Sequence, residues 1–178
     1  MVRTPVTDIR RAVRLALQED LPLGDATTVA LFPAPTPARA RIVAQQPLVV
    51  AGLAAALHTF RTVDASLVLS IQHHDGEQAQ EGACLLQIEG DGRSILKAER
   101  VALNFLQHLS GVATLTRRFC EAVRKYPVTI LDTRKTIRAG GCHRAYILQR
   151  DSSRHFNHGL PFDQLDSVTD GRRAHVIQ

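Results

Sequence analysis

The sequence predicts an α/β protein in which an N-terminal α+β sandwich domain leads into the start of an incomplete α/β barrel. Within residues 38–99, short β-branched and leucine-rich runs are separated by glycine-containing turns, which is typical of strands. Residues 99–126 show one long helical pattern, and a continuous apolar run at 128–131 leads into a charged turn. A helix followed by such a strand and turn is the alternation of a parallel sheet or barrel.

Length and composition restrict the class of protein. The 178 residues suffice for about one to one and a half domains, with a core that needs no disulfides. The cysteines, Cys84, Cys120 and Cys142, are widely spaced, which favours reduced thiols in a cytoplasmic protein. The N-terminus has no apolar signal-peptide core, and the longest apolar run, residues 47–57, is too short to span a bilayer. We therefore expect a cytoplasmic protein without a membrane segment.

The net charge of +5 is carried by 19 Arg and only 3 Lys. Basic chains often bind polyanions. However, the arginines are dispersed, only 8 residues are aromatic and no nucleic-acid motif occurs, so we expect no nucleic-acid partner. Arginine also suits small anionic substrates, because its planar fork contacts carboxylate and phosphate bidentately.

The first element is a helix within residues 7–20. Thr7 or Asp8 is expected to cap its start, and Pro22 and Gly24 to end it. One face carries the arginines at 10, 11 and 14, and the apolar stripe on the other face consists of Ile9, Val13, Ala16 and Leu17. In the loop that follows, the residues interpreted as turn or cap residues are Asp25, Thr27 and Thr28.

The next segment alternates strand, helix and strand, with the helix at residues 53–64. The turn-rich string 75–96 resembles in architecture the half-barrel of lipoyl- and biotinyl-type modules, but it lacks their modifiable lysine at a hairpin tip. His73 and His74 are adjacent, which places them on opposite faces of a strand. They are therefore poor joint metal ligands, and we expect one to be packed and the other solvated.

The long helix at residues 99–126 has an apolar stripe from Ala102 to Val123. Ser110-Gly111 lies in the middle of this pattern, where glycine costs about 1 kcal/mol of helix propensity relative to alanine. This position indicates a bend or two consecutive helices. Pro127 ends the pattern, and residues 128–131 follow as a compact buried strand.

Residues 132–136, Asp-Thr-Arg-Lys-Thr, follow that strand directly. Ligands of parallel α/β folds bind where the strands end at their carboxyl side. Strand alternation directs Thr133 and Lys135 to one face and Asp132 and Arg134 to the other. The two cations and two hydroxyls would suit phosphate or carboxylate oxygens. The alternative is a solvated turn with an Asp132–Arg134 surface pair of little energetic value.

Arg100 lies near the expected N-terminus of the long helix. A cation is unfavourable at that end because the helix dipole is positive there, while anions are attracted. An arginine at this place makes sense if an anion joins it. Alternatively, Arg100 extends into solvent beside Glu99.

Three strings together carry a family resemblance: EDLPLGDATT at 19–28, EGDGRSILKAERVALNFLQHLSGVATLTRRF at 89–119, and VTILDTRKT at 128–136. In this order and spacing they resemble quinolinate phosphoribosyltransferase, the carboxylating nicotinate-nucleotide pyrophosphorylase of NAD biosynthesis. The resemblance covers about residues 8–136 and is close through 89–136. A molybdenum-locus homologue and the nicotinate-specific members of the same fold family are the alternatives.

The resemblance implies an N-terminal α/β sandwich, a C-terminal α/β barrel, and a homodimer whose active sites include residues from both subunits. The implied reaction joins quinolinate to phosphoribosyl pyrophosphate, releases pyrophosphate and carbon dioxide, gives nicotinate mononucleotide, and uses Mg²⁺. The residues to which the resemblance assigns substrate binding are Arg100, Thr133, Arg134 and Lys135. It assigns no metal ligand to this chain.

Residues 137–178 depart from the family pattern. The family continues with a Pro-Gly turn, a helix and a strand ending in Gly-Gly and His-Arg motifs, whereas here Gly-Gly-Cys-His-Arg at 140–144 follows almost at once. We include His143 and Arg144 as further candidates for substrate binding. The 42 residues of this segment contain 6 Arg and 4 His but no Lys and no Glu. They predict a frameshifted or deleted, poorly ordered stretch, with a genuine variable tail as the alternative.

We therefore divide the chain into a sandwich domain at 1–98, the first barrel elements at 99–136 and an atypical tail at 137–178. A complete barrel takes ~200–250 residues, but only 79 residues remain from Arg100 onward. We expect the chain alone to be incomplete and inactive. The competing function is a non-catalytic dimerisation or binding fragment, and a nucleic-acid binder would differ from both by a steeply salt-dependent affinity.

Overall fold

The computed structural model describes residues 6–21, 28, 34–128, 130–131 and 175–176. Its helices and strands follow in the order α1 (Val6–Asp20), β1 (Pro37–Val43), β2 (Leu48–Val49), α3 (Leu53–Val63), β3 (Val68–Ile71), β4 (Gln78–Ala79), β5 (Cys84–Asp91), α4 (Gly92–Val123), β6 (Ile130–Leu131) and β7 (His175–Val176).

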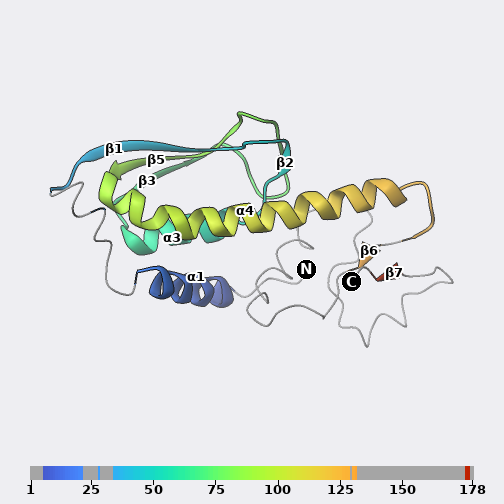
Figure 1. Cartoon of the computed structure of the whole chain (residues 1–178), viewed down its shortest axis with the longest axis horizontal. Helices are drawn as coiled ribbons and strands as arrows, with labels where there is room; N and C mark the ends of the chain where they lie inside the picture. The colour runs from blue at the N-terminus through green and yellow to red at the C-terminus, as the bar shows by residue number, and fades with distance from the viewer. Residues whose placement is uncertain (1–5, 22–27, 29–33, 129, 132–174, 177–178) are drawn as a thin grey trace.

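A three-stranded antiparallel sheet and a set of helices form successive layers (Figure 1). The strand order is β1-β5-β3, so that β5 lies in the centre and pairs with both neighbours. The helices α3 and α4 pack together beneath this sheet, and α1 packs on α3 and α4 from the side away from the sheet (Figure 1). This arrangement confirms the predicted α+β sandwich.

The core lies between the sheet and the helix pair. From β5, Leu86 and Ile88 point inward and are 0% and 1% exposed, and from α3, Phe60 is 1% exposed. From α4, the small residues Ala98 and Ala102 join the same cluster and let the helix approach closely. Burying one large apolar side chain contributes about 1.5–3 kcal/mol. The strand–helix–strand pattern predicted for this segment is therefore confirmed as one packed unit.

The start of α4 differs from the prediction. The sequence pattern placed the helix start at residue 99, but α4 begins at Gly92. Gly90 has φ +150°, and a Cβ there would lie 2.5 Å from the side chain of Leu67, so a glycine is needed where β5 ends. Asp91 then caps the helix directly. The Gly-Asp-Gly string is thus a strand end and helix cap, and the prediction of a turn there is wrong.

The interior of α4 also differs. The helix runs without interruption through Ser110-Gly111, so the predicted division into two helices is wrong. The Ser110 hydroxyl is buried and accepts a hydrogen bond from Ala51 N at 3.0 Å while donating to Ala51 O at 3.1 Å. One turn later, the Thr114 hydroxyl accepts from Val49 N at 2.9 Å. These two side chains bond to backbone groups in and directly after β2, which also pairs with β4 in a separate two-stranded sheet. These bonds explain the polar residues in this part of the helix.

Close packing reinforces this contact between α4 and the segment after β2. Gly52 adopts φ +98°, a left-handed conformation that favours glycine. A Cβ at Gly52 would lie 2.8 Å from Leu109 Cδ1 and 3.0 Å from Phe105 O. The chain therefore turns from β2 into α3 directly against the helix, and only glycine fits there.

The first helix is confirmed, with a different start. Val13 is fully buried, Ile9, Ala16 and Leu17 are partly buried, and the three arginines are exposed. Because α1 begins at Val6, Thr7 and Asp8 lie inside its first turn, and the prediction that one of them caps it is wrong. The helix ends at Asp20, just before the predicted stop at Pro22. Thr28 is buried, whereas Asp25 and Thr27 lie outside the described residues.

The histidine pair lies beyond the end of β3, in a bend rather than in a strand. His73 is partly buried, and its Nδ1 lies 2.9 Å from the carbonyl oxygen of Cys84, whereas the side chain of His74 is exposed. The expectation of one packed and one solvated histidine is confirmed, although the strand geometry used to reach it is wrong. No cluster of three or more His, Cys, Asp or Glu residues in the described part could hold a metal ion.

The strand predicted at 128–131 is present as the shorter β6. It pairs in parallel with β7, with Ile130 opposite His175 and Leu131 opposite Val176. Most of the predicted tail lies outside the described residues, and the domain division at residues 98 and 136 stays a prediction. None of the described helices is long and apolar enough to cross a membrane.

Candidate functional site

Arg100 is the predicted site residue that the structure describes. It lies eight residues after Gly92, more than two turns into α4, so the prediction that it sits near the helix N-terminus is wrong. Its side chain is 75% exposed, and its Nη1 donates to Asp20 Oδ1 at 3.0 Å. The dipole argument for Arg100 therefore fails. Two features of Arg100 still bear on anion binding, namely its exposed side chain and its ion pair with Asp20.

Asp20 is a site residue that the sequence reasoning missed. It occupies the last position of α1, 80 residues before its partner, and its side chain is only 18% exposed. The contact uses one guanidinium nitrogen and leaves Nε and Nη2 of Arg100 with no hydrogen bond to the described residues. The signal that points to it is the carboxylate at the start of EDLPLGDATT, a string that carries the family resemblance but to which no site residue is assigned.

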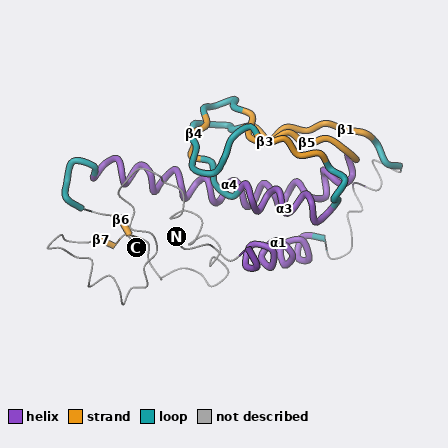
Figure 2. Tube along the Cα trace, turned by 180° about the vertical axis from the view of Figure 1, so that it is seen from behind, coloured by secondary structure: helices purple, strands orange, loops and turns teal. Residues whose placement is uncertain are grey.

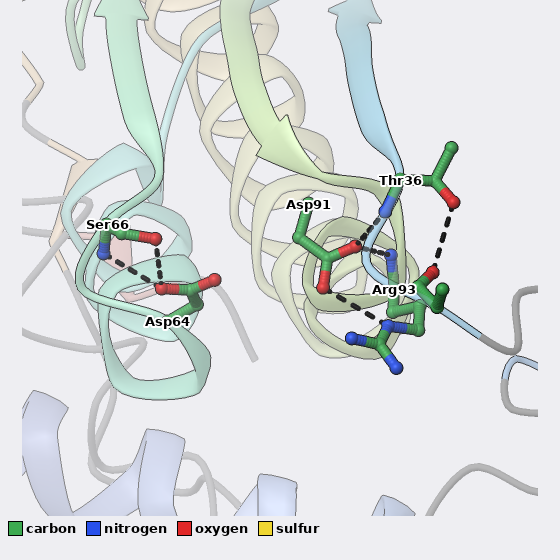
Figure 3. Close-up of polar contacts among 6 residues, drawn as sticks. Thr36, Asp64, Ser66, Asp91 and Arg93 are labelled. Atoms are coloured by element: carbon green, nitrogen blue, oxygen red, sulfur yellow. Dashed lines mark hydrogen bonds and ion pairs between the residues drawn. The ribbon is translucent and has the colours of Figure 1, made fainter.

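The cap at the junction of β5 and α4, drawn in Figure 3, fixes the start of the helix that carries Arg100. Asp91 Oδ1 accepts hydrogen bonds from Thr36 N at 3.1 Å and Arg93 N at 3.2 Å, and its Oδ2 accepts from Arg93 Nε at 3.2 Å. The hydrogen bond from the Thr36 N–H is the main cause of a lowered pKa of the Asp91 carboxyl; desolvation opposes it, and the hydrogen bonds and charge of Arg93 lower the pKa further. The cap thereby joins the start of β1 to the start of α4.

The remaining predicted site residues, Thr133, Arg134, Lys135, His143 and Arg144, lie outside the described residues. β6 ends at Leu131, where the predicted strand ends, and residues 132–136, for which a charged turn is predicted, follow it in the sequence. Whether Arg100 and that turn meet is thus untested, and their joint role stays a prediction. The described residues also offer no ligand set for the Mg²⁺ that the family resemblance implies.

Comparison with a protein-family description decides the family. The description "Quinolinate phosphoribosyl transferase, N-terminal domain" matches residues 25–110, the segment that holds the sheet, α3 and the first half of α4. This chain belongs to the quinolinate phosphoribosyltransferase family. The expectation formed from the three strings is confirmed, and the matched segment contains Arg100.

Relatives of known name agree with this family. The chain is 40% identical over 133 residues to quinolinate phosphoribosyltransferase [decarboxylating] 1b of Nicotiana tabacum. The matched residues make up 74% of this chain and 37% of the tobacco protein. It is 41% identical over 132 residues to the carboxylating nicotinate-nucleotide pyrophosphorylase of Mycobacterium leprae, covering 72% of this chain and 46% of that protein.

Solved structures of the family have the same fold. The nicotinate-nucleotide pyrophosphorylase of Francisella tularensis matches with a TM-score of 0.74 at 31% identity, covering 78% of this chain and 49% of that chain. NadC of Streptococcus pyogenes matches with a TM-score of 0.77 at 34% identity, covering 83% of this chain and 52% of that chain. The chain thus spans between a third and about half of the length of these relatives.

Proposed function

We propose that this chain provides the N-terminal half of a quinolinate-binding site, in a protein related to the enzyme that makes nicotinate mononucleotide from quinolinate and phosphoribosyl pyrophosphate. The observation that carries the proposal is Arg100, which is exposed on α4 within the segment that matches the family. Toward the described residues its guanidinium makes one hydrogen bond, through Nη1, and a planar fork of this kind binds carboxylates bidentately through two N–H groups.

The proposed partners follow from the charge of the substrates. Quinolinate carries two carboxylates and phosphoribosyl pyrophosphate several phosphate groups, so that their site needs several cations. Arg100 is the first of these, and Thr133, Arg134 and Lys135 are proposed to supply the others. In such a site, preorganised donors stabilise the charge that develops during transfer.

Binding and turnover of the purified chain test this proposal separately. Quinolinate added to the chain should cause weak, saturable NMR shifts of the backbone amide signals around Arg100 on α4, and Arg100→Ala should abolish this saturable effect. Arg39→Ala is the matched control, because Arg39 is also exposed and paired with a carboxylate, at 3.3 Å from Glu89. An equal loss of quinolinate binding in the Arg100→Ala and Arg39→Ala variants would show that Arg100 is not part of the site.

Catalysis by the chain alone is not part of the proposal. We expect no quinolinate-dependent release of pyrophosphate, because the chain spans less than half of the tobacco relative and the barrel cannot close within it. Measured release would show that the proposed incompleteness is wrong while leaving the family and Arg100 unaffected.

The chain is also proposed to act in the cytoplasm as a homodimer, the assembly implied by the family resemblance. The C-terminal half of α4 supports this, since Leu115 is 52% and Phe119 41% exposed on it. Mass measurement of the purified chain should give twice the mass of 19.6 kDa. A monomer that also forms no heterodimer with an intact family member would exclude both the homodimer and a regulatory role as a dimerisation fragment.

A further inference from the structure

The last residue of the N-terminal helix carries a charge of the wrong sign for its position. Helix α1 ends at Asp20, directly after Glu19, and its last turn contains no basic residue. The dipole of a helix is negative at its C-terminus, so carboxylates are unfavourable there. A cation from another element offsets this repulsion, because Arg100 Nη1 donates to Asp20 Oδ1 at 3.0 Å. The helix itself therefore gives no reason for an acid at position 20, whereas Arg100 does.

The packing of α1 holds the Asp20 carboxylate in place. The helix packs on α3 and α4 and lies beside them in both views (Figures 1 and 2), and its Val13 is completely buried. The Asp20 side chain is 18% exposed, whereas that of Arg100 is 75% exposed. The carboxylate is therefore the fixed member of the ion pair, and the guanidinium is the member that faces solvent.

The pair of Asp20 and Arg100 differs from the other ion pairs between described residues. Those pairs are Arg39–Glu89, Arg93–Asp91 and Arg117–Glu121. Two of them join residues within four positions of each other, and the third joins opposite residues of neighbouring strands. Of the four pairs, the one with Asp20 connects two helices, and its carboxylate is the least exposed. It is therefore the pair best suited to hold a long arginine side chain in one orientation.

We propose that Asp20 is a positioning residue for Arg100, and that it orients the guanidinium to receive a carboxylate of quinolinate. The inference rests on the function proposed above for Arg100, and it adds a residue that precedes the matched family segment 25–110. An arginine loses rotamer freedom when it binds a ligand, and a contact that fixes it beforehand reduces that loss. Because Asp20 engages Nη1, the edge formed by Nε and Nη2 receives the two carboxylate oxygens.

Charge alone and positioning predict opposite effects of removing Asp20. Loss of a negative charge near an anion site strengthens the binding of quinolinate, whereas loss of the group that orients Arg100 weakens it. In the full chain, Asp20→Ala should weaken quinolinate binding by about five-fold, measured from the amide signals around Arg100 on α4. Alanine is a good helix former and preserves α1.

Glu19→Ala is the matched control. Glu19 is an exposed carboxylate at the same helix end, and it forms no ion pair with another described residue. The substitution removes the same charge and the same unfavourable interaction with the helix dipole, but it leaves the partner of Arg100 in place. The affinity for quinolinate should therefore stay unchanged or rise slightly in Glu19→Ala.

Two further measurements separate positioning from a structural role. The amide oxygen of Asp20→Asn can still accept from Nη1, so this variant should bind more weakly than wild type but more tightly than Asp20→Ala. Without quinolinate, NMR of isotope-labelled arginine follows the rotation of the Arg100 guanidinium about its Nε–Cζ bond, with Arg100→Ala identifying the signal. Rotation should be faster in Asp20→Ala than in wild type, and unchanged in Glu19→Ala.

The outcomes distinguish this inference from the function on which it rests. Unchanged binding in Arg100→Ala, or no binding by the wild-type chain, would exclude the proposed function and this inference with it. Loss of binding in Arg100→Ala together with unchanged or tighter binding in Asp20→Ala would overturn the positioning role alone, because Asp20 would then compete with the ligand for Arg100. The amide signals of α1 show whether the helix stays docked, and if Asp20→Ala releases it, the affinity of Asp20→Asn decides.

Discussion

The two halves of α4 are built from the same kind of sequence but have different surroundings. From Gly92 to Ala113 the helix carries all of its buried residues, which face the sheet, α3 and β2. Beyond Ala113 none of its residues is buried against the described part of the chain, and Leu115 and Phe119 are 52% and 41% exposed. Figure 1 shows this second half extending past the sheet.

This difference teaches that an apolar helical stripe predicts a buried face without telling what buries it. In the first half, the stripe is covered by the elements of the same matched domain. In the second half, Thr114 near the boundary still accepts a hydrogen bond from Val49 N, and farther along, the Arg117 Nε–Glu121 Oε1 pair at 2.9 Å lies within the helix itself. Such pairs are worth only about 0.3–0.5 kcal/mol. The first half of α4 therefore belongs to the core, whereas the described residues fully bury no side chain of its second half.

The largest expected effect comes from truncating one leucine in each half. Leu106→Ala removes a side chain that is 3% exposed in the main core and should destabilise the chain by about 2–5 kcal/mol. Leu115→Ala removes the same atoms from an exposed position and should change stability by about 0.5 kcal/mol or less. Urea unfolding followed by circular dichroism measures both. A comparable loss from Leu115→Ala would mean that another surface covers the second half.

The hydroxyl contacts at the boundary of the halves are the next target. Ser110→Ala leaves the buried N–H of Ala51 without its acceptor, which should cost about 1–3 kcal/mol. Ser66→Ala is the control, because its hydroxyl donates to Asp64 at an exposed position, with an Oγ–Oδ1 distance of 2.6 Å. Hydrogen exchange should also become faster at the Ala51 amide. An unchanged exchange rate would contradict the assigned role of Ser110.

Local patterns predicted the first half of the structure well. The period of Ile9, Val13 and Leu17 predicted α1, and the leucine-rich run that contains Leu86 and Ile88, set between glycine-containing turns, predicted a strand at β5. The family strings predicted the correct family for the same reason, since they lie mostly in this packed segment.

Contacts between distant segments could not be predicted in this way. The pairing of Asp20 with Arg100 joins residues 80 positions apart, and no local pattern contains it. The polar Ser110 looked like a weak point of the helix, because its partner backbone lies at Ala51 in another element. The cap at Asp91 was hidden for a similar reason, since the Thr36 N–H that completes it comes from the start of another strand.

Gly111 gives a smaller, stabilising effect. A Cβ at this position would meet nothing within 4 Å, and the residue is exposed in the middle of a continuous helix. Gly111→Ala should therefore stabilise the chain by about 0.5–1 kcal/mol through helix propensity alone. Gly52→Ala is the contrasting variant, which should destabilise because its Cβ would lie 2.8 Å from Leu109 Cδ1. A destabilised Gly111→Ala variant would indicate a partner packed against that face.

The smallest expected effect concerns Asp91, which caps the first half of α4, and it is lost as the solution becomes acidic. Because the hydrogen bonds from Thr36 and Arg93 lower the pKa of Asp91 in the folded chain, its carboxylate stabilises the fold above the ordinary aspartate value of 3.8. That contribution decreases as the pH falls from 3.8 through the lowered folded pKa, where the folded carboxyl also becomes protonated.

Asp91→Asn keeps a residue suited to helix caps but removes the titrating charge. Its free energy of unfolding should therefore differ from that of the wild type near neutral pH, and the difference should shrink as the pH is lowered below 3.8. Urea unfolding at a series of pH values measures this. Glu81→Gln is the control, as Glu81 is an exposed carboxylate with no hydrogen bond or ion pair to other described residues. A difference between Asp91→Asn and wild type that stays constant into acid would show that the capping geometry, and not the charge, joins β1 to α4.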